Sequence, residues 1–167
     1  EGTLNGKTGF ICTNNTGNDI VNTDILNFRI FGETNSTFVV SNSLGLLLAI
    51  FLNVNHIKLL SGTYISSTLN INSNTLIEGL GNVIILDTRT EIDTVENITI
   101  KNITYDNNGL NDVITINGTS SNIKIINCKF IGTSTSSRNL SIFGGTNITI
   151  EDCSFSIDDT QIDILNT

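Results

Sequence analysis

Carboxylates and their charged neighbours come nearest to a catalytic arrangement in this chain. Acid–base hydrolysis needs two carboxyl groups, one to protonate the leaving oxygen and one to activate water, and the only adjacent aspartates are Asp158-Asp159 in the turn-like stretch SIDDTQ. An elimination would use an Arg or Lys base beside carboxylates that bind a cation. Arg89 stands among four such carboxylates, Asp87, Glu91, Asp93 and Glu96. We interpret the first group as a solvated loop and the second as a polar loop between strands.

Other reactive side chains lack partners in the sequence. The single histidine, His56, introduces an apolar strand, which favours a capping or packing role, and Cys12 has no evident His or Asp partner to activate it as a nucleophile. No two of the three cysteines have the C-x-x-C spacing of a zinc site. The Asp-Asn-Asn-Gly turn that starts at Asp106 has oxygen atoms suited to Ca²⁺, but a plain turn explains it better. We therefore expect no cofactor.

The elements that must position these residues are repeated. Three similar segments, NITIKNITY (97–105), NIKIINCKF (122–130) and NITIEDCSF (147–155), follow one another at a constant interval, and TLIEGLG (75–81) is a looser copy one step earlier, at an offset of 24. A unit of about 25 residues cannot bury its own apolar face and must stack on its neighbours. Ile and Thr favour strands, Asn favours turns, and the three occur 27, 23 and 25 times. The sequence therefore predicts parallel strands stacked in register, one coil per repeat.

Aligning the repeats predicts which side chains form the core. Strand alternation places two isoleucine columns inside, and two further apolar columns follow after a shift of one residue. The four columns are Ile98/Ile123/Ile148, Ile100/Ile125/Ile150, Ile103/Cys128/Cys153 and Tyr105/Phe130/Phe155. Cys128 and Cys153 are then most simply stacked, buried thiols, and a disulfide between them is the minority interpretation.

The shift of phase requires a one-residue corner. That corner is occupied by Asn102, Asn127 and Asp152, residue types that tolerate the left-handed conformation. Stacked amides at this position would hydrogen-bond from coil to coil. We expect this structural ladder to be buried and to weaken at Asp152, which cannot donate as an amide does. The columns predicted to face outward are Thr99/Lys124/Thr149, Lys101/Ile126/Glu151 and Thr104/Lys129/Ser154.

The predicted fold is all-β, a right-handed parallel β-helix with coils of about 25 residues, in a single domain over residues 1–167. Residues 1–55 would form an irregular lead-in, with short apolar pieces such as ILNFRIF, and a capping helix within residues 41–53; a buried strand is the alternative for that helix. Residues 56–167 would form the stacked coils. The markers HIKLLSGTYI, NTLIEGLG and N-I-T-I-x-N/D-x-x-F resemble the right-handed parallel β-helix (pectin-lyase-like) superfamily. The resemblance is closest to its non-catalytic surface and viral spike-type members, since the chain lacks the Gly-His-Gly and Arg-x-Lys motifs of the hydrolases.

Composition limits the partners. A net charge of −8 and a pI near 4.3 argue against nucleic acid, and the longest apolar run, residues 46–52, is too short for membrane insertion. Seven N-x-S/T sequons suit an extracellular, cell-surface or virion-surface location, although Asn- and Thr-rich sequence also produces them by chance. The expected carriers, if glycans are present, are Asn97, Asn117, Asn139 and Asn147.

Three functions remain open from the sequence. The first is a non-catalytic adhesin or spike/fibre module that contacts a surface polysaccharide or a protein partner. The second is a polysaccharide lyase or glycoside hydrolase whose active coils are degenerate or lie outside a fragment. The third is a structural subunit of a trimeric or filamentous assembly, with homo-oligomeric or end-to-end stacking through an uncapped C-terminal coil.

Overall fold

The computed structural model describes residues 2–4, 7–9, 37–107, 112–132, 138–156 and 162–164. Its single described helix is α1 (Ser43–Phe51). The first strands are β1 (Gly2–Leu4), β2 (Lys7–Gly9), β3 (Thr37–Val40), β4 (His56–Ile65), β5 (Thr68–Asn70), β6 (Leu76–Leu86), β7 (Arg89–Asp93) and β8 (Glu96–Lys101). The remaining strands are β9 (Thr104–Asn107), β10 (Asp112–Asn117), β11 (Ser121–Ile126), β12 (Lys129–Gly132), β13 (Arg138–Ile142), β14 (Thr146–Glu151), β15 (Ser154–Ser156) and β16 (Ile162–Ile164).

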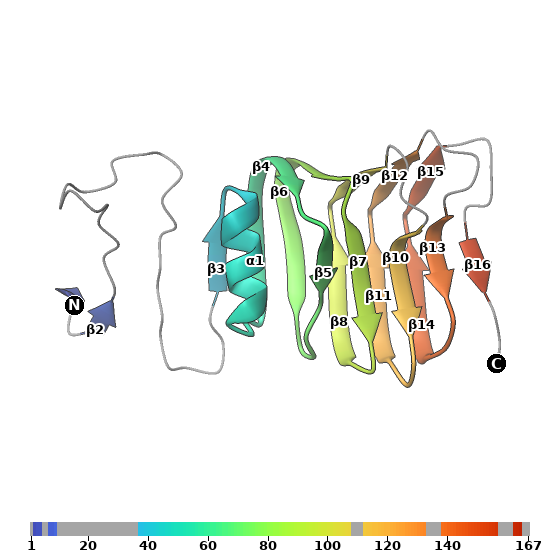
Figure 1. The fold of residues 1–167 in the computed structure, drawn as a ribbon, viewed down its shortest axis with the longest axis horizontal. Helices are drawn as coiled ribbons and strands as arrows, with labels where there is room; N and C mark the ends of the chain where they lie inside the picture. Colours follow the sequence, from blue (N-terminus) through green and yellow to red (C-terminus); the bar gives the residue numbers. More distant parts are fainter. Residues whose placement is uncertain are drawn as a thin grey trace.

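The strands from β3 onward form a parallel β-solenoid of about five turns (Figure 1). A nine-stranded sheet contains β3, β4, β6, β8, β9, β11, β12, β14 and β15, and a five-stranded sheet has the order β16-β13-β10-β7-β5. Every pairing within these two sheets is parallel, and β1–β2 forms a separate antiparallel pair. The predicted coiled architecture is therefore confirmed.

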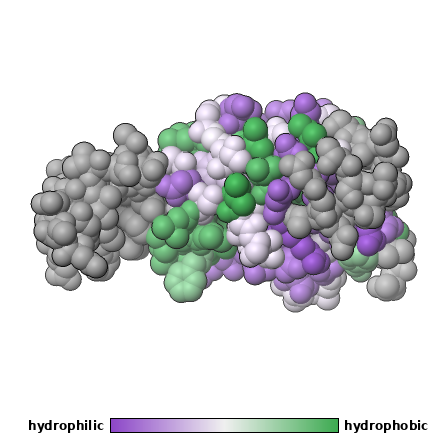
Figure 2. Space-filling view, turned by 45° about the horizontal axis from the view of Figure 1, so that its top comes forward, coloured by the Kyte–Doolittle hydropathy of each residue, from purple (hydrophilic) through white to green (hydrophobic). Residues whose placement is uncertain are grey.

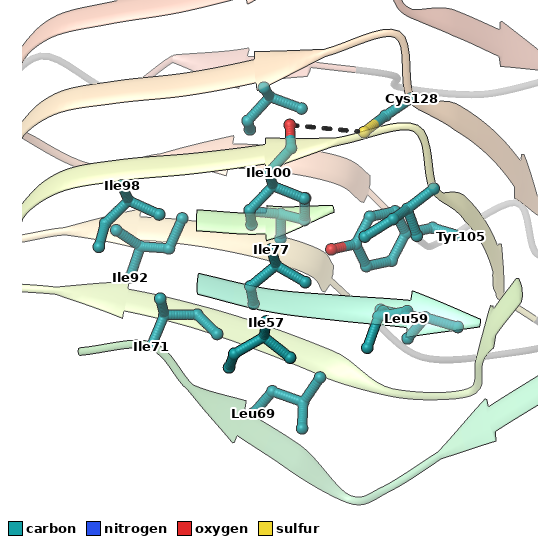
Figure 3. Packing of buried hydrophobic residues seen from close by; sticks show 14 of the residues in the cluster. Ile57, Leu59, Leu69, Ile71, Ile77, Ile92, Ile98, Ile100, Tyr105 and Cys128 are labelled. Carbon is teal, nitrogen blue, oxygen red and sulfur yellow. Dashed lines mark hydrogen bonds between the residues drawn. The ribbon is translucent and has the colours of Figure 1, made fainter. Parts of the chain in front are cut away.

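The three aligned repeats stack as the columns predict. Ile123 pairs with Ile98 on one side and Ile148 on the other, and the next isoleucine column follows the same register. Phe130 lies between Tyr105 and Phe155, with ring centroids 5.4 and 4.9 Å apart and nearly parallel planes. Figure 3 shows the isoleucines of successive coils side by side in the core. Like side chains therefore contact like side chains along the solenoid axis.

The register of the earlier copy differs from the sequence prediction. Ile77, rather than Leu76, pairs with Ile100, so the true offset is shorter than the predicted one by a single position. Ile77 is 2% exposed and belongs to the core. Because a slip of one residue turns a strand over, only this register buries Ile77. The earliest coils are thus shorter than the later ones.

A helix closes the solenoid interior at its N-terminal end, as predicted. The side chain of Asn42 accepts a hydrogen bond from the Gly45 amide at 2.8 Å, which caps α1, and the alternative of a buried strand is wrong. Leu46, Ala49 and Ile50 point into the core. A Cβ at Gly45 would lie 3.3 Å from the Val40 Cβ, so the glycine lets the helix approach β3 closely.

The one-residue corner adopts the left-handed conformation. The φ angles of Asn102, Asn127 and Asp152 are 59°, 48° and 52°, and the Asn127 Nδ2 donates to the Asn102 Oδ1 at 2.9 Å. The amide ladder at this corner is confirmed, but it is not buried: Asn102 is half-buried, and Asn127 and Asp152 are exposed. The ladder therefore runs along an outward edge of the solenoid. One coil earlier, a Cβ at Gly79 would lie against the Asn102 carbonyl oxygen, so only glycine fits beneath the corner.

Candidate functional site on the outer face of the long sheet

The outer face of the nine-stranded sheet carries two columns that run across six neighbouring strands, β3, β4, β6, β8, β11 and β14. One column, in register order, is Thr37, His56, Leu76, Thr99, Lys124 and Thr149, and the other is Val39, Lys58, Glu78, Lys101, Ile126 and Glu151. Parallel strands lie about 4.8 Å apart, so each column spans roughly 24 Å. The sequence predicted the last three members of each column correctly. The face is therefore a long strip suited to an extended ligand.

A network of three charged or titratable residues crosses this strip. Glu78 Oε2 lies 3.2 Å from His56 Nε2, and Glu78 Oε1 lies 3.0 Å from Lys101 Nζ. The hydrogen bond from Lys101 is the main cause that lowers the pKa of Glu78; burial opposes it, and His56 adds to it. The sequence analysis favoured a capping or packing role for His56. In the structure His56 instead contributes to a charged network on the surface. These contacts join strands β4, β6 and β8.

The chain's positive charge concentrates on the same sheet although the whole chain is acidic. Four lysines, Lys58, Lys101, Lys124 and Lys129, lie on its outward positions. Lys124 and Lys129 are exposed, and Lys58 and Lys101 are half-buried. Lys129 follows the corner and continues the outer face onto the column Thr104/Lys129/Ser154. The outward positions of this sheet therefore offer both cations and hydroxyl groups.

Arginines on the five-stranded sheet are held in ion pairs. Arg89 Nε lies 3.2 Å from Glu91 Oε1, so one of the four carboxylates near Arg89 in sequence pairs with it. Arg138 Nε lies 3.0 Å from Asp112 Oδ1, and Arg138 Nη1 lies 2.7 Å from Asp163 Oδ2. The hydrogen bond to Asp163 is the main cause that raises the pKa of Arg138. The Arg138 cluster joins three coils and is a structural clamp that the sequence analysis missed.

A second amide ladder runs along the opposite ends of the long strands. Asn97 Nδ2 donates to Asn74 Oδ1 at 2.9 Å, Asn122 Nδ2 to Asn97 Oδ1 at 3.0 Å, and Asn147 Nδ2 to Asn122 Oδ1 at 2.6 Å. All four residues have φ between 53° and 61°. The sequence contained a signal for this ladder, because Asn97, Asn122 and Asn147 recur at the repeat interval. The sequence analysis considered Asn97 and Asn147 only as glycosylation sites. Beside this ladder lies a polar surface hollow of about 270 Å³, lined by Ser73, Thr94, Val95, Glu96, Thr119 and Ser121.

The expected glycan carriers have different surroundings. Asn97 and Asn147 are exposed but use their Nδ2 atoms in the second ladder, and Asn117 is half-buried. Asn139 is 1% exposed, so its amide does not reach solvent as a glycan linkage would require. This burial argues against Asn139. Glycosylation at the other three positions stays a prediction.

The remaining candidates divide between structural roles and undescribed positions. Cys128 and Cys153 are free thiols, and burial raises the pKa of the Cys128 thiol to about 12, so it is not a nucleophile at neutral pH. Asp106 and Asn107 end β9. Cys12, Asp158 and Asp159 lie outside the described residues. Within the described ranges, no cluster of three His, Cys, Asp or Glu residues could hold a metal ion, and no helix has the length and apolarity to cross a bilayer.

Comparisons found no matching family model, no matching characterised protein and no matching solved structure for this chain. The identification that stands is therefore architectural: the described residues form a parallel β-solenoid, an architecture compatible with the β-helix superfamily.

Proposed function

We propose that this protein is a non-catalytic, extracellular β-helical module that binds a linear anionic polysaccharide along the outer face of its nine-stranded sheet. The observation that carries the proposal is the concentration of four lysines on that face of a chain with a net charge of −8. Thr99, Thr104 and Thr149 add hydroxyl groups between the lysines. Lysine side chains gathered on one sheet complement a polymer with carboxylate or sulfate groups.

The electrostatics of the strip favour binding over acid–base hydrolysis. A catalytic acid needs a pKa raised toward neutral pH, usually beside a second carboxyl group. Glu78 has the opposite environment, because Lys101 and His56 lower its pKa and its register neighbours are Lys58 and Lys101. Glu78 is therefore ionised at neutral pH and holds the Lys101 ammonium group in an ion pair. Its arrangement supports a role in orienting Lys101.

Binding to a panel of polysaccharides tests the proposal. Uronate-containing or sulfated polymers should bind, neutral glucans should not, and affinity should fall as salt is raised, because the contacts are charged and exposed. Lys124→Gln combined with Lys129→Gln should weaken binding. The matched control, Arg89→Gln on the five-stranded sheet, should leave it unchanged.

Three results would contradict the proposal. The first is equal binding of neutral and anionic polymers. The second is an equal loss of affinity in the lysine and arginine variants. The third is the release of reducing ends or unsaturated uronates during incubation, which would establish an enzyme instead.

A further inference from the structure

The polar hollow beside the second amide ladder lies where two neighbouring turns differ in length. Asn117 pairs with Asp93 near the ends of β10 and β7. Ser121 pairs with Glu96 at the starts of β11 and β8. The turn from β10 to β11 is therefore one residue longer than the turn from β7 to β8 on the preceding coil (Figure 1). The longer turn presents Thr119, which is exposed and lines the hollow.

Hydrogen bonds between three successive coils fix the walls of the hollow. The Glu96 amide donates to Ser73 Oγ at 3.1 Å. The Ser121 amide donates to the Val95 carbonyl oxygen at 3.0 Å, and the Val95 amide donates to Ser120 Oγ at 3.4 Å. A site whose walls are already held in place needs little ordering when a ligand binds, which lowers the entropic cost of association.

One residue that lines the hollow has a strained backbone. Thr94 has φ 56°, in the left-handed region that β-branched residues rarely adopt. The corresponding position of the next coil, after Asn117, is Gly118 with φ 62°. Strain of this kind is often retained at ligand-binding positions. A threonine at a position that suits glycine supplies the hollow with a hydroxyl group, and Thr94 Oγ1 donates to Asp93 Oδ1 at 3.0 Å.

Three further polar groups of the hollow are available to a ligand. Among the described residues, none forms a hydrogen bond or an ion pair with the Glu96 carboxylate or with the Thr119 and Ser121 hydroxyl groups. A hydroxyl group both donates and accepts, and a carboxylate accepts. Val95, which is half-buried against the core, adds an apolar contact. The hollow therefore combines several hydrogen-bonding groups with one small apolar surface.

The surroundings of the hollow disfavour other classes of ligand. None of the described residues that line it is a lysine or an arginine, so sulfate, phosphate and carboxylate groups find no counter-charge there. Glu96 is the one carboxylate among those residues, which is too few for a divalent cation. Figure 2 shows hydrophobic residues gathered at the end of the molecule that carries α1, where Leu44 and Phe51 are exposed. The hollow is not part of that apolar surface.

We propose that the polar hollow binds one neutral sugar ring. The Glu96 carboxylate and the hydroxyl groups of Thr119 and Ser121 hydrogen-bond to the sugar hydroxyl groups, and Val95 contacts a C–H face of the ring. Pockets for drug-sized ligands begin at about 300 Å³, so a hollow of about 270 Å³ suits a single ring. So small a ligand makes few contacts, and we expect a dissociation constant in the millimolar range. This uncharged ligand distinguishes the site from the lysine-bearing face of the nine-stranded sheet.

NMR titration of the isotope-labelled full chain tests the proposal. The probes are the methyl glycosides of glucose, galactose, mannose and N-acetylglucosamine, each raised to about 100 mM, which fills a millimolar site. At least one of them should cause saturable amide shifts at Thr94, Val95 and Thr119. Shifts confined to Lys124 and Lys129, or no saturable shift with any of the four probes, would overturn the proposal.

A matched pair of threonine variants tests the contact itself. Thr119→Val keeps the size of the side chain and removes a hydroxyl group from the hollow, so affinity for the sugar should fall about 2- to 10-fold. Thr146→Val is the control, because Thr146 pairs with Ser121 but is not among the residues that line the hollow. Both threonines are exposed, so both variants should fold with nearly unchanged Tm. An equal loss of affinity in the two variants, or none in Thr119→Val, would contradict the site.

Discussion

Replacing Asn122 interrupts the second amide ladder at its centre. Its Nδ2 donates to Asn97 and its Oδ1 accepts from Asn147, at 3.0 and 2.6 Å, and its backbone has φ 56°. Each exposed hydrogen bond contributes about 0.5–1 kcal/mol. A residue with a Cβ but no local hydrogen bond loses a further ~1 kcal/mol in the left-handed conformation. Asn122→Gly should therefore cost about 1–2 kcal/mol and Asn122→Ala about 2–3 kcal/mol.

Thermal or urea unfolding monitored by circular dichroism measures both losses. For a chain of this size, about 1 kcal/mol corresponds to about 2–4 °C in Tm. Asn70→Ala is the matched control, because Asn70 is exposed in β5 and is not among the residues with positive φ, and it should change stability by less than about 0.5 kcal/mol. If Asn122→Ala is no worse than Asn70→Ala, the ladder does not stabilise the fold. If the Ala and Gly variants are equal, the left-handed corner carries no cost.

Three further predictions concern the core. Phe130→Ala should cost about 3–5 kcal/mol in chemical denaturation, and Phe155→Ala clearly less, because Phe130 is fully buried between two rings whereas Phe155 is half-buried at the end of the stack; equal losses would contradict the stacking. In a Cys12→Ser background, an aromatic disulfide reagent at pH ~8 should modify Cys153 well before Cys128, whose pKa is raised to about 12 by burial; faster reaction of Cys128 would refute its placement. Burial raises the pKa of Tyr64 to about 12 and also raises that of Tyr105, so the folded state keeps both phenols protonated. The stability that they contribute is complete below their unfolded pKa of about 10 and is lost as the pH rises from about 10 to 12, which tyrosinate absorbance should show as one transition coupled to unfolding.

The later coils were predictable because their repeat is strict. Ile98, Ile123 and Ile148 fall at one constant interval, and the same interval relates Asn102 to Asn127 at the corner. Where coil length changes, sequence alignment alone loses the register. Gly79 stands where the later coils have an asparagine at the corner, and the step from Ile77 to Ile100 is shorter than the later repeat. Sequence alignment therefore paired Leu76 with Ile100, whereas Leu76 pairs with Thr99 in the structure.

The surface network was harder to predict for the same reason. Glu78 follows His56, and Lys101 follows Glu78, at intervals that are shorter than the dominant repeat. Arg138 and its two aspartates come from strands between the aligned segments, where apolar alternation gives little register information. Pattern analysis therefore located the interior columns better than the charged contacts outside them.

Methyl NMR of the Ile-labelled chain tests the stacked register most directly. Nuclear Overhauser effects should connect Ile123 with both Ile98 and Ile148, because neighbouring strands lie about 4.8 Å apart. Ile98 and Ile148 are two strands apart, at roughly 10 Å, and should show no direct effect in short mixing times. A direct effect between Ile98 and Ile148, or none from Ile123 to either, would contradict the coil-on-coil arrangement.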